Sequence, residues 1–211
     1  MTLSAYAEQE ELEKLKAWWK HYGNALLFGV ALGAAILFGV HYWNQHRERS
    51  LGEASALYQQ MLQDQRAKKL DSARQAGDKL LNDYAATPYA AMAGLVLARL
   101  DHDAGDAAGA RTRLQWVLDH AKDAAAEQAA RLRLARLYAS SGEHERALSL
   151  IEAKQPPGFE SEYLELKGDI FSALGRKDEA RQAYREAIQH LSNGSAYAPV
   201  LTMKLDDLGP G

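Results

Sequence analysis

The sequence predicts an all-α protein in which a single N-terminal transmembrane helix precedes a solenoid of antiparallel helix pairs. Two observations carry this prediction. The run ALLFGVALGAAILFGV, at residues 25–40, contains no charged side chain. Beyond residue 50, strong helix formers dominate the chain, mainly Ala, Leu, Arg, Glu and Gln. No sustained alternation of apolar and polar residues indicates a β-strand.

The transmembrane helix is predicted over residues 22–43. The uncharged run alone would span about 24 Å, less than the roughly 30 Å of bilayer hydrocarbon, whereas 22–43 would span about 33 Å. Aromatic residues, which favour the lipid headgroup level, flank the run: Trp18, Trp19, Tyr22, Tyr42 and Trp43. The alternatives are a buried core helix and a removable signal peptide. A signal peptide has a short basic leader and a cleavage site, whereas four glutamates precede this run and HYWNQHR follows it.

Residues 1–24 are predicted to form a cytoplasmic amphipathic segment. In EQEELEKLKAWWKHY, at residues 8–22, apolar side chains recur at helical spacing between charges. This pattern favours a short helix on the cytoplasmic surface of the lipid bilayer; the alternative is a polar tail that contains tryptophans. Three lysines on this side of the span, against two arginines on the other, favour an N-terminus inside the cell.

Two glycines inside the span, Gly29 and Gly33, form a GxxxG pair. Small residues four apart let membrane helices approach closely, so this pair predicts a packing face for a partner helix or a second copy. The alternative is that the glycines reflect only the general abundance of glycine in membrane helices.

Residues 51–211 are long enough for one ordinary domain. Prolines in this part stand near predicted helix boundaries and in the tail, as expected for residues that end helices. The pattern predicts helices at 51–64, 71–85, 88–103, 107–121, 125–140, 144–153, 160–173, 177–191 and 196–207.

An internal repeat surrounds three glycines, Gly105, Gly142 and Gly175, spaced 37 and 33 residues apart. Seven residues before each glycine stands a small residue: Ala98, Ala135 and Gly168. Five residues after each glycine stands an alanine: Ala110, Ala147 and Ala180. Nine residues after each glycine stands a large apolar residue: Leu114, Ile151 and Tyr184. Each glycine is predicted to end a helix in the left-handed conformation, while the small residues let paired helices approach. The period indicates tetratricopeptide-like repeats; the alternative is an unrelated helical bundle. A degenerate pair at 51–85 begins the stack, and a last helix with Leu201 and Leu208 caps it.

The first helix of each pair lines the inner face of such a stack. This places a candidate protein-binding surface on Met92, Leu95, Arg99, Leu132, Arg136, Glu162, Glu165 and Asp169. Arg99 and Arg136 occupy equivalent places in adjacent repeats, where two guanidinium groups could hold a carboxylate or peptide carbonyls. The alternative is that they form ordinary ion pairs along their own helices.

No catalytic, cofactor-binding or metal-binding motif is found in the sequence. The absence of cysteine excludes disulfides and thiol catalysis, and a net charge of −3 argues against nucleic acid as a partner. The segment DHDAGD at residues 101–106 gathers carboxylates and a histidine, but it lacks the ligand register of a calcium loop.

Two segments carry a family resemblance: the glycine-rich span FGVALGAAILFGVHYWN and the tail TMKLDDL. The whole chain resembles the ancillary SecYEG translocon subunit family of Gram-negative bacteria, the YfgM type. The resemblance implies a single-pass inner-membrane protein with its N-terminus in the cytoplasm and a periplasmic domain at 51–211. It also implies association with the SecYEG translocon, with a membrane-anchored PpiD-type periplasmic chaperone, and with newly translocated client polypeptides.

The sequence therefore favours a non-enzymatic adaptor without cofactors, held beside the translocon exit. One alternative is a membrane-tethered scaffold for another envelope complex that self-associates through Gly29 and Gly33. Another is an enzyme that uses the cluster Asp101, His102 and Asp103.

Overall fold

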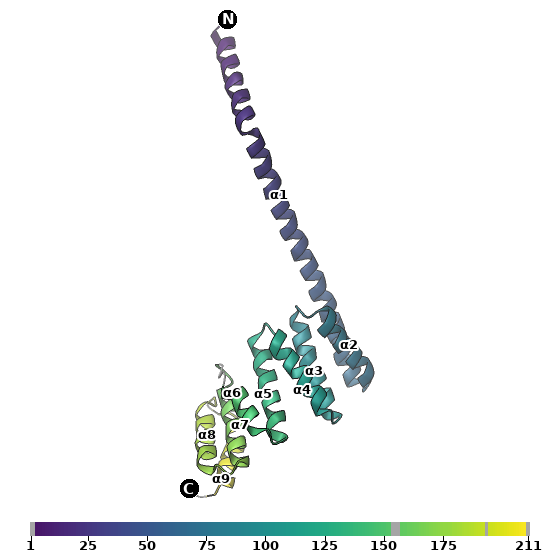
Figure 1. Cartoon of the computed structure of the whole chain (residues 1–211), viewed down its shortest axis with the longest axis vertical. Helices are drawn as coiled ribbons and strands as arrows, with labels where there is room; N and C mark the ends of the chain where they lie inside the picture. The colour runs from purple at the N-terminus through teal and green to yellow at the C-terminus, as the bar shows by residue number, and fades with distance from the viewer. Residues whose placement is uncertain (1–2, 153–156, 193, 210–211) are drawn as a thin grey trace. The chain divides into compact units, whose positions relative to one another are not determined.

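The structure is a computed structural model that describes residues 3–152, 157–192 and 194–209, without the side chains of 3–15, 17, 23–27 and 29–31. Within these residues the fold consists of nine α-helices and no β-strand, which confirms the predicted all-α class. The helices are α1 Leu3–Arg66, α2 Leu70–Asp83, α3 Pro88–Asp103, α4 Ala107–His120, α5 Ala124–Ser140, α6 His144–Glu152, α7 Glu160–Ala173, α8 Lys177–Gln189 and α9 Ala198–Asp207 (Figure 1). The chain divides into two compact units, residues 1–52 and 53–211.

Helix α1 runs without interruption from Leu3 to Arg66. The expectation that a separate helix begins near residue 51 is wrong. The segment 44–57 contains no proline and only one glycine, Gly52, and one interior glycine costs a helix only about 1 kcal/mol. Nothing in this segment therefore ends the helix that begins upstream.

The predicted membrane span, residues 22–43, includes residues whose side chains the structure does not describe, namely 23–27 and 29–31. Within the described part of the chain, no helical stretch combines the length and apolar character needed to cross a membrane. Large apolar side chains of the first unit, among them Phe28, Ile36 and Phe38, are exposed.

The glycine pair of the span stays a prediction. Gly29 lies outside the residues whose side chains are described. A Cβ added at Gly33 would meet nothing within 4 Å.

The second unit is a stack of helix pairs in which each helix from α2 onward packs against the next (Figure 1). Helix α3 also contacts α5, and α5 contacts α7, so first helices of successive pairs lie side by side. The last turns of α1 pair with α2 through a shared apolar cluster. This is the tetratricopeptide-like stack that the repeat predicted.

The three repeat glycines end their helices as predicted. Gly105, Gly142 and Gly175 have φ of +83°, +80° and +73°. At each turn the next residue donates its N–H to the carbonyl five positions back, for example Asp106 to Asp101 at 2.8 Å. These left-handed turns satisfy carbonyls that the helix end would otherwise leave unpaired.

The small and large residues of the repeat pack against each other between paired helices. A Cβ at Gly168 would lie 2.5 Å from Cε1 of Tyr184, so only glycine fits at this crossing of α7 and α8. In the preceding repeat, Ala135 and Ile151 are both fully buried in the same cluster. The predicted close approach is confirmed at Gly168.

The first pair follows the same plan with different residues. Lys68, 37 positions before Gly105, takes the left-handed conformation with φ of +60°. Met61 stands where the later repeats have a small residue, and Gly77 stands where they have a large one. A Cβ at Gly77 would lie 2.9 Å from Cε of Met61, so the methionine fills the space that the glycine leaves.

Helix α9 closes the far end of the stack. Leu201 and Leu208 are buried in the cluster formed by α5 to α8, and Leu205 packs on its edge. Met203, on the other side of the helix, is exposed. The predicted cap is confirmed.

Candidate protein-binding groove

A groove of about 510 Å³ opens across the first repeats of the second unit. Residues of α1, α3, α4 and α5 line it: Tyr58, Gln65, Met92, Leu95, Val96, Ala98, Arg99, His102, Leu114, Arg133, Arg136 and Leu137. The groove therefore brings together four residues of the predicted inner face, namely Met92, Leu95, Arg99 and Arg136. Its lining combines apolar side chains with guanidinium groups.

The two predicted arginines have different partners. Nε of Arg99 donates to both carboxylate oxygens of Asp103, one turn along α3, at 2.8 Å. This is the ordinary pair along a helix that the sequence left open as an alternative. Nη2 of Arg136 instead lies 3.9 Å from Oε2 of Glu165 on α7, in the next repeat.

Arg133, the third guanidinium group of the groove, was not predicted from the sequence. Its Nη1 donates to the Leu95 carbonyl oxygen at 3.5 Å, and it forms no ion pair among the described residues. Burial and the positive charges of Arg99 and Arg136 lower the pKa of Arg133. The signal available in the sequence was the spacing of Arg133 and Arg136, which places both on one face of α5.

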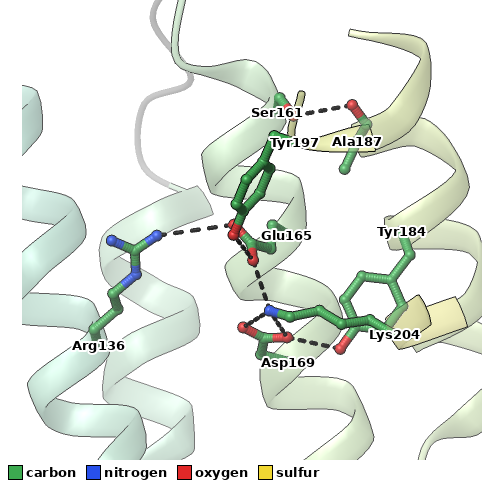
Figure 2. A network of polar contacts seen from close by, with 8 residues as sticks. All are labelled: Arg136, Ser161, Glu165, Asp169, Tyr184, Ala187, Tyr197 and Lys204. Atoms are coloured by element: carbon green, nitrogen blue, oxygen red, sulfur yellow. Dashed lines mark hydrogen bonds and ion pairs between the residues drawn. The ribbon is translucent and has the colours of Figure 1, made fainter. Parts of the chain in front are cut away.

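The remaining predicted residues do not line the groove. Leu132 is buried in the core of the last repeats, and Glu162 is exposed on α7. Glu165 and Asp169 point toward α9, where the cationic head of Lys204 lies between their carboxylates (Figure 2).

The contacts of Lys204 form a polar network that ties α9 to α7. Nζ of Lys204 lies 2.6 Å from Oε1 of Glu165 and 2.8 Å from both carboxylate oxygens of Asp169. Tyr197 donates its hydroxyl to Glu165 and Tyr184 donates to Asp169, each at 2.7 Å (Figure 2). The chain's own last helix therefore occupies the acidic end of the predicted inner face, and the basic groove between α3 and α5 stays open.

Electrostatics in the network follow from burial and charge pairing. Burial opposes the charge on Lys204, but hydrogen bonds to Asp169 and Glu165 outweigh it and raise the pKa of Lys204. The hydrogen bond to Glu165, together with burial, raises the pKa of Tyr197. Burial, with the hydrogen bond to Asp169, raises the pKa of Tyr184.

These shifts predict a loss of stability at alkaline pH. Burial also raises the pKa of Tyr163 to about 12 from an ordinary 10.0. A group with a raised pKa in the folded state stabilises fully below its unfolded pKa, and this stabilisation is lost as pH rises. Each buried group of this kind removes up to about 1.4 kcal/mol per pH unit, and the exposed Tyr197 contributes less. Thermal unfolding of the full chain, followed by circular dichroism, should show a falling midpoint above pH 10.

Tyr163→Phe should make that decline less steep, since phenylalanine has no proton to lose. At pH 7 the variant should lose about 1 kcal/mol, because Tyr163 donates a hydrogen bond to Oε1 of Gln128 at 2.6 Å. An equally steep decline in the variant would contradict the assignment to Tyr163.

The carboxylates of the segment 101–106 serve the fold. The carboxylate of Asp101 lies 3.2 Å from Arg74 and 3.5 Å from Arg113. Asp103 pairs with Arg99, and Asp106 accepts the N–H of Gly109 at the start of α4. Across the described residues, no group of three or more His, Asp or Glu side chains could hold a metal ion.

The stacked helix pairs, their glycine turns and the groove across them define a helical-repeat protein of the tetratricopeptide class. The family model of a tetratricopeptide repeat-like domain matches residues 16–210. The chain belongs to the ancillary SecYEG translocon subunit family, as its relatives of nearly equal length show.

Several relatives carry the name ancillary SecYEG translocon subunit. The relative from Haemophilus influenzae is 30% identical, and the match covers 95% of this chain and 97% of that one. The relative from Neisseria gonorrhoeae is 28% identical, with coverage of 95% and 97%. The relative from Escherichia coli is 29% identical, with coverage of 95% and 96%.

Among solved structures, the crystal structure of a tetratricopeptide repeat protein from Parabacteroides merdae is similar, with a TM-score of 0.50 and 21% identity. The match covers 74% of this chain but 57% of that one. This likeness concerns the fold.

Proposed function

We propose that the protein is a membrane-anchored, non-enzymatic adaptor of the Sec translocon. Its repeat domain would contact periplasmic chaperones and newly translocated proteins. The observation that carries the proposal is the match to translocon subunits over nearly the whole chain, together with an open groove on the repeat domain. The groove has a volume of about 510 Å³ and a lining of apolar side chains and guanidinium groups, which suits a segment of a partner polypeptide.

The anchor of this adaptor is the helix at residues 22–43, placed in the inner membrane with residues 1–24 in the cytoplasm and 51–211 in the periplasm. The uncharged run at 25–40 and its aromatic flanks support this placement. Exposed large side chains such as Phe28 and Phe38 also support it, because lipid would cover apolar surface that water does not favour.

The partners of the adaptor are the SecYEG translocon and, as the family resemblance implies, a PpiD-type membrane-anchored chaperone. Client polypeptides that leave the translocon are a third partner. Anchoring in the same membrane raises the local concentration to about millimolar for short linkers. A groove of modest affinity is therefore sufficient.

Affinity purification of the tagged full-length chain from solubilised membranes of its own host tests this proposal. We expect translocon components and a PpiD-type chaperone to co-purify, whereas an unrelated single-pass protein with the same tag should recover neither. Photo-crosslinkers at exposed positions, Phe38 for the anchor and Met92 for the groove, would then separate the two contacts. Recovery of no translocon component and no chaperone would refute the proposal.

A second candidate function is a self-associating scaffold. The open space around Gly33 favours it, because a second helix could approach there. Crosslinking in membranes should then yield dimers that the double variant Gly29→Ile, Gly33→Ile loses. An unchanged crosslinked mass in the variant would remove the main support for self-association.

A further inference from the structure

We infer that the groove binds an extended acidic segment of a partner polypeptide, with Arg133 as the principal anchor for a carboxylate side chain. The inference rests on the proposed function, in that the partner is a protein, and it adds the chemistry of the segment. The carboxylate lies between Arg133 and Arg136, and a neighbouring apolar side chain packs on Met92 and Leu137.

The lining of the groove carries an excess of positive charge. Three guanidinium groups line it, and none of the described lining residues is acidic. Arg99 is neutralised by Asp103, and Arg136 lies 3.9 Å from its nearest carboxylate. Among the described residues, the polar partner of Arg133 is the Leu95 carbonyl oxygen alone. The lining therefore lacks an anion, which a ligand can supply.

The surroundings of the Arg133 guanidinium group also favour an anionic ligand. Partial burial and two like charges lower its pKa, so its charged form is less favourable here than in water. A carboxylate beside it would reverse that effect, because an opposite charge at close range favours the charged form. Guanidinium and carboxylate groups also match in a planar, two-bond geometry.

The groove also combines charged, apolar and hydrogen-bonding side chains. Met92 is 41% exposed and lines the groove with Leu95, Val96 and Leu137. The Tyr58 hydroxyl and the Gln65 amide can hydrogen-bond to a peptide backbone. An acidic polypeptide that also carries apolar side chains uses all three surfaces, whereas a lipid headgroup would use only the charges. The volume of about 510 Å³ lies within the usual range of ligand pockets, which fits a few residues of extended chain.

The test uses the full-length chain in neutral detergent micelles and a dye-labelled octapeptide of alternating glutamate and leucine with both ends blocked. Fluorescence anisotropy should show saturable binding that weakens as salt rises. The matching peptide of glutamine and leucine should bind at least about tenfold more weakly, since charge-assisted hydrogen bonds are lost. Empty micelles provide the background.

Variants of the chain locate the site. Arg133→Gln should weaken binding of the acidic peptide about tenfold or more, and Arg133→Lys should retain part of the affinity. Arg185→Gln, an equal change at an exposed position of α8 outside the groove, should leave it unchanged. Unchanged circular dichroism would show that each variant is folded. Arg136→Gln is a second groove variant and should also weaken binding of the acidic peptide.

Several results would overturn the inference. They are equal binding of the acidic and glutamine peptides, equal binding by wild type and both groove variants, and binding only when the peptide has a free C-terminus. Binding to phosphatidylglycerol vesicles through Arg133, without affinity for the peptide, would assign the groove to a membrane surface instead. Translocon co-purification is a separate measurement, so the proposed function can stand where this inference fails.

Discussion

The double variant Met61→Ala, Gly77→Leu should keep most of the stability that either single substitution removes. Met61→Ala alone leaves a cavity in a fully buried position, at a cost of about 2–5 kcal/mol. Gly77→Leu alone forces a side chain into space that Met61 and Leu97 occupy, since its Cβ would lie 2.9 Å from each. Overpacking of this kind costs about 1–3 kcal/mol.

The pair together recreates the arrangement of the next repeat. There, Ala98 and Leu114 stand at the equivalent positions and pack in one cluster with Leu134, the equivalent of Leu97. Thermal unfolding of the four proteins of this cycle should give a favourable coupling of at least about 1 kcal/mol, within the range for residues in contact. If the stability losses of the two single variants simply add in the double variant, the large residue at 61 and the small residue at 77 do not compensate each other.

Lys204→Met should destabilise the protein by about 3 kcal/mol. The substitution leaves the carboxylate of Glu165, whose side chain is 5% exposed, without its closest cation. Removing one partner of a buried ion pair typically costs about 3–5 kcal/mol; the 28% exposure of the Lys204 side chain places the expected effect at the low end. Lys177→Met, on an exposed position of α8, is the matched control and should have little effect.

A second substitution distinguishes lost charge pairing from lost packing in the Lys204→Met variant. Without the lysine, the buried carboxylate of Glu165 keeps the Tyr197 hydroxyl at 2.7 Å, but the nearest guanidinium group, that of Arg136, lies 3.9 Å away. A buried charge without a close partner is costly. Glu165→Gln in the Lys204→Met background should therefore recover part of the lost stability at pH 7, because it removes that charge. An equal loss in the double variant would indicate packing alone.

The sequence predicts the helices well where strong local signals mark their ends. Helices α3 and α7 begin and end at the predicted residues, 88–103 and 160–173. Pro88 at the first position of α3 and Gly105 just past its end are both local markers. The start of a helix at 51 was wrong because no such marker stands there.

The first repeat shows what position-by-position comparison misses. Lys68 holds the turn in a conformation for which glycine is the usual residue, and Met61 with Gly77 reverses the usual order of sizes. The space between the helices is filled in every repeat, but the residue that fills it comes from either helix. A pattern of residue types cannot detect such an exchange.

The site was predicted only in part because its contacts join distant positions. Arg99 and Arg136 were found from the repeat, whereas Arg133 has no counterpart in the neighbouring unit that would identify it. The pairing of Lys204 with Glu165 joins residues 39 positions apart, beyond the reach of helical periodicity. The sequence could place Glu165 and Asp169 on the inner face, but not the helix that covers them.

Arg136 belongs to two sites of the domain. It lines the groove, and it lies near the carboxylate of Glu165, which holds the terminal helix. A ligand in the groove and the Glu165 carboxylate would therefore compete for the same guanidinium group. An anion bound in the groove would attract Arg136 away from Glu165. Lys204 would then be the remaining cation beside the Glu165 carboxylate. Binding of an anion in the groove would thus change the contacts that hold the terminal helix, and Arg136 alone would couple the two sites.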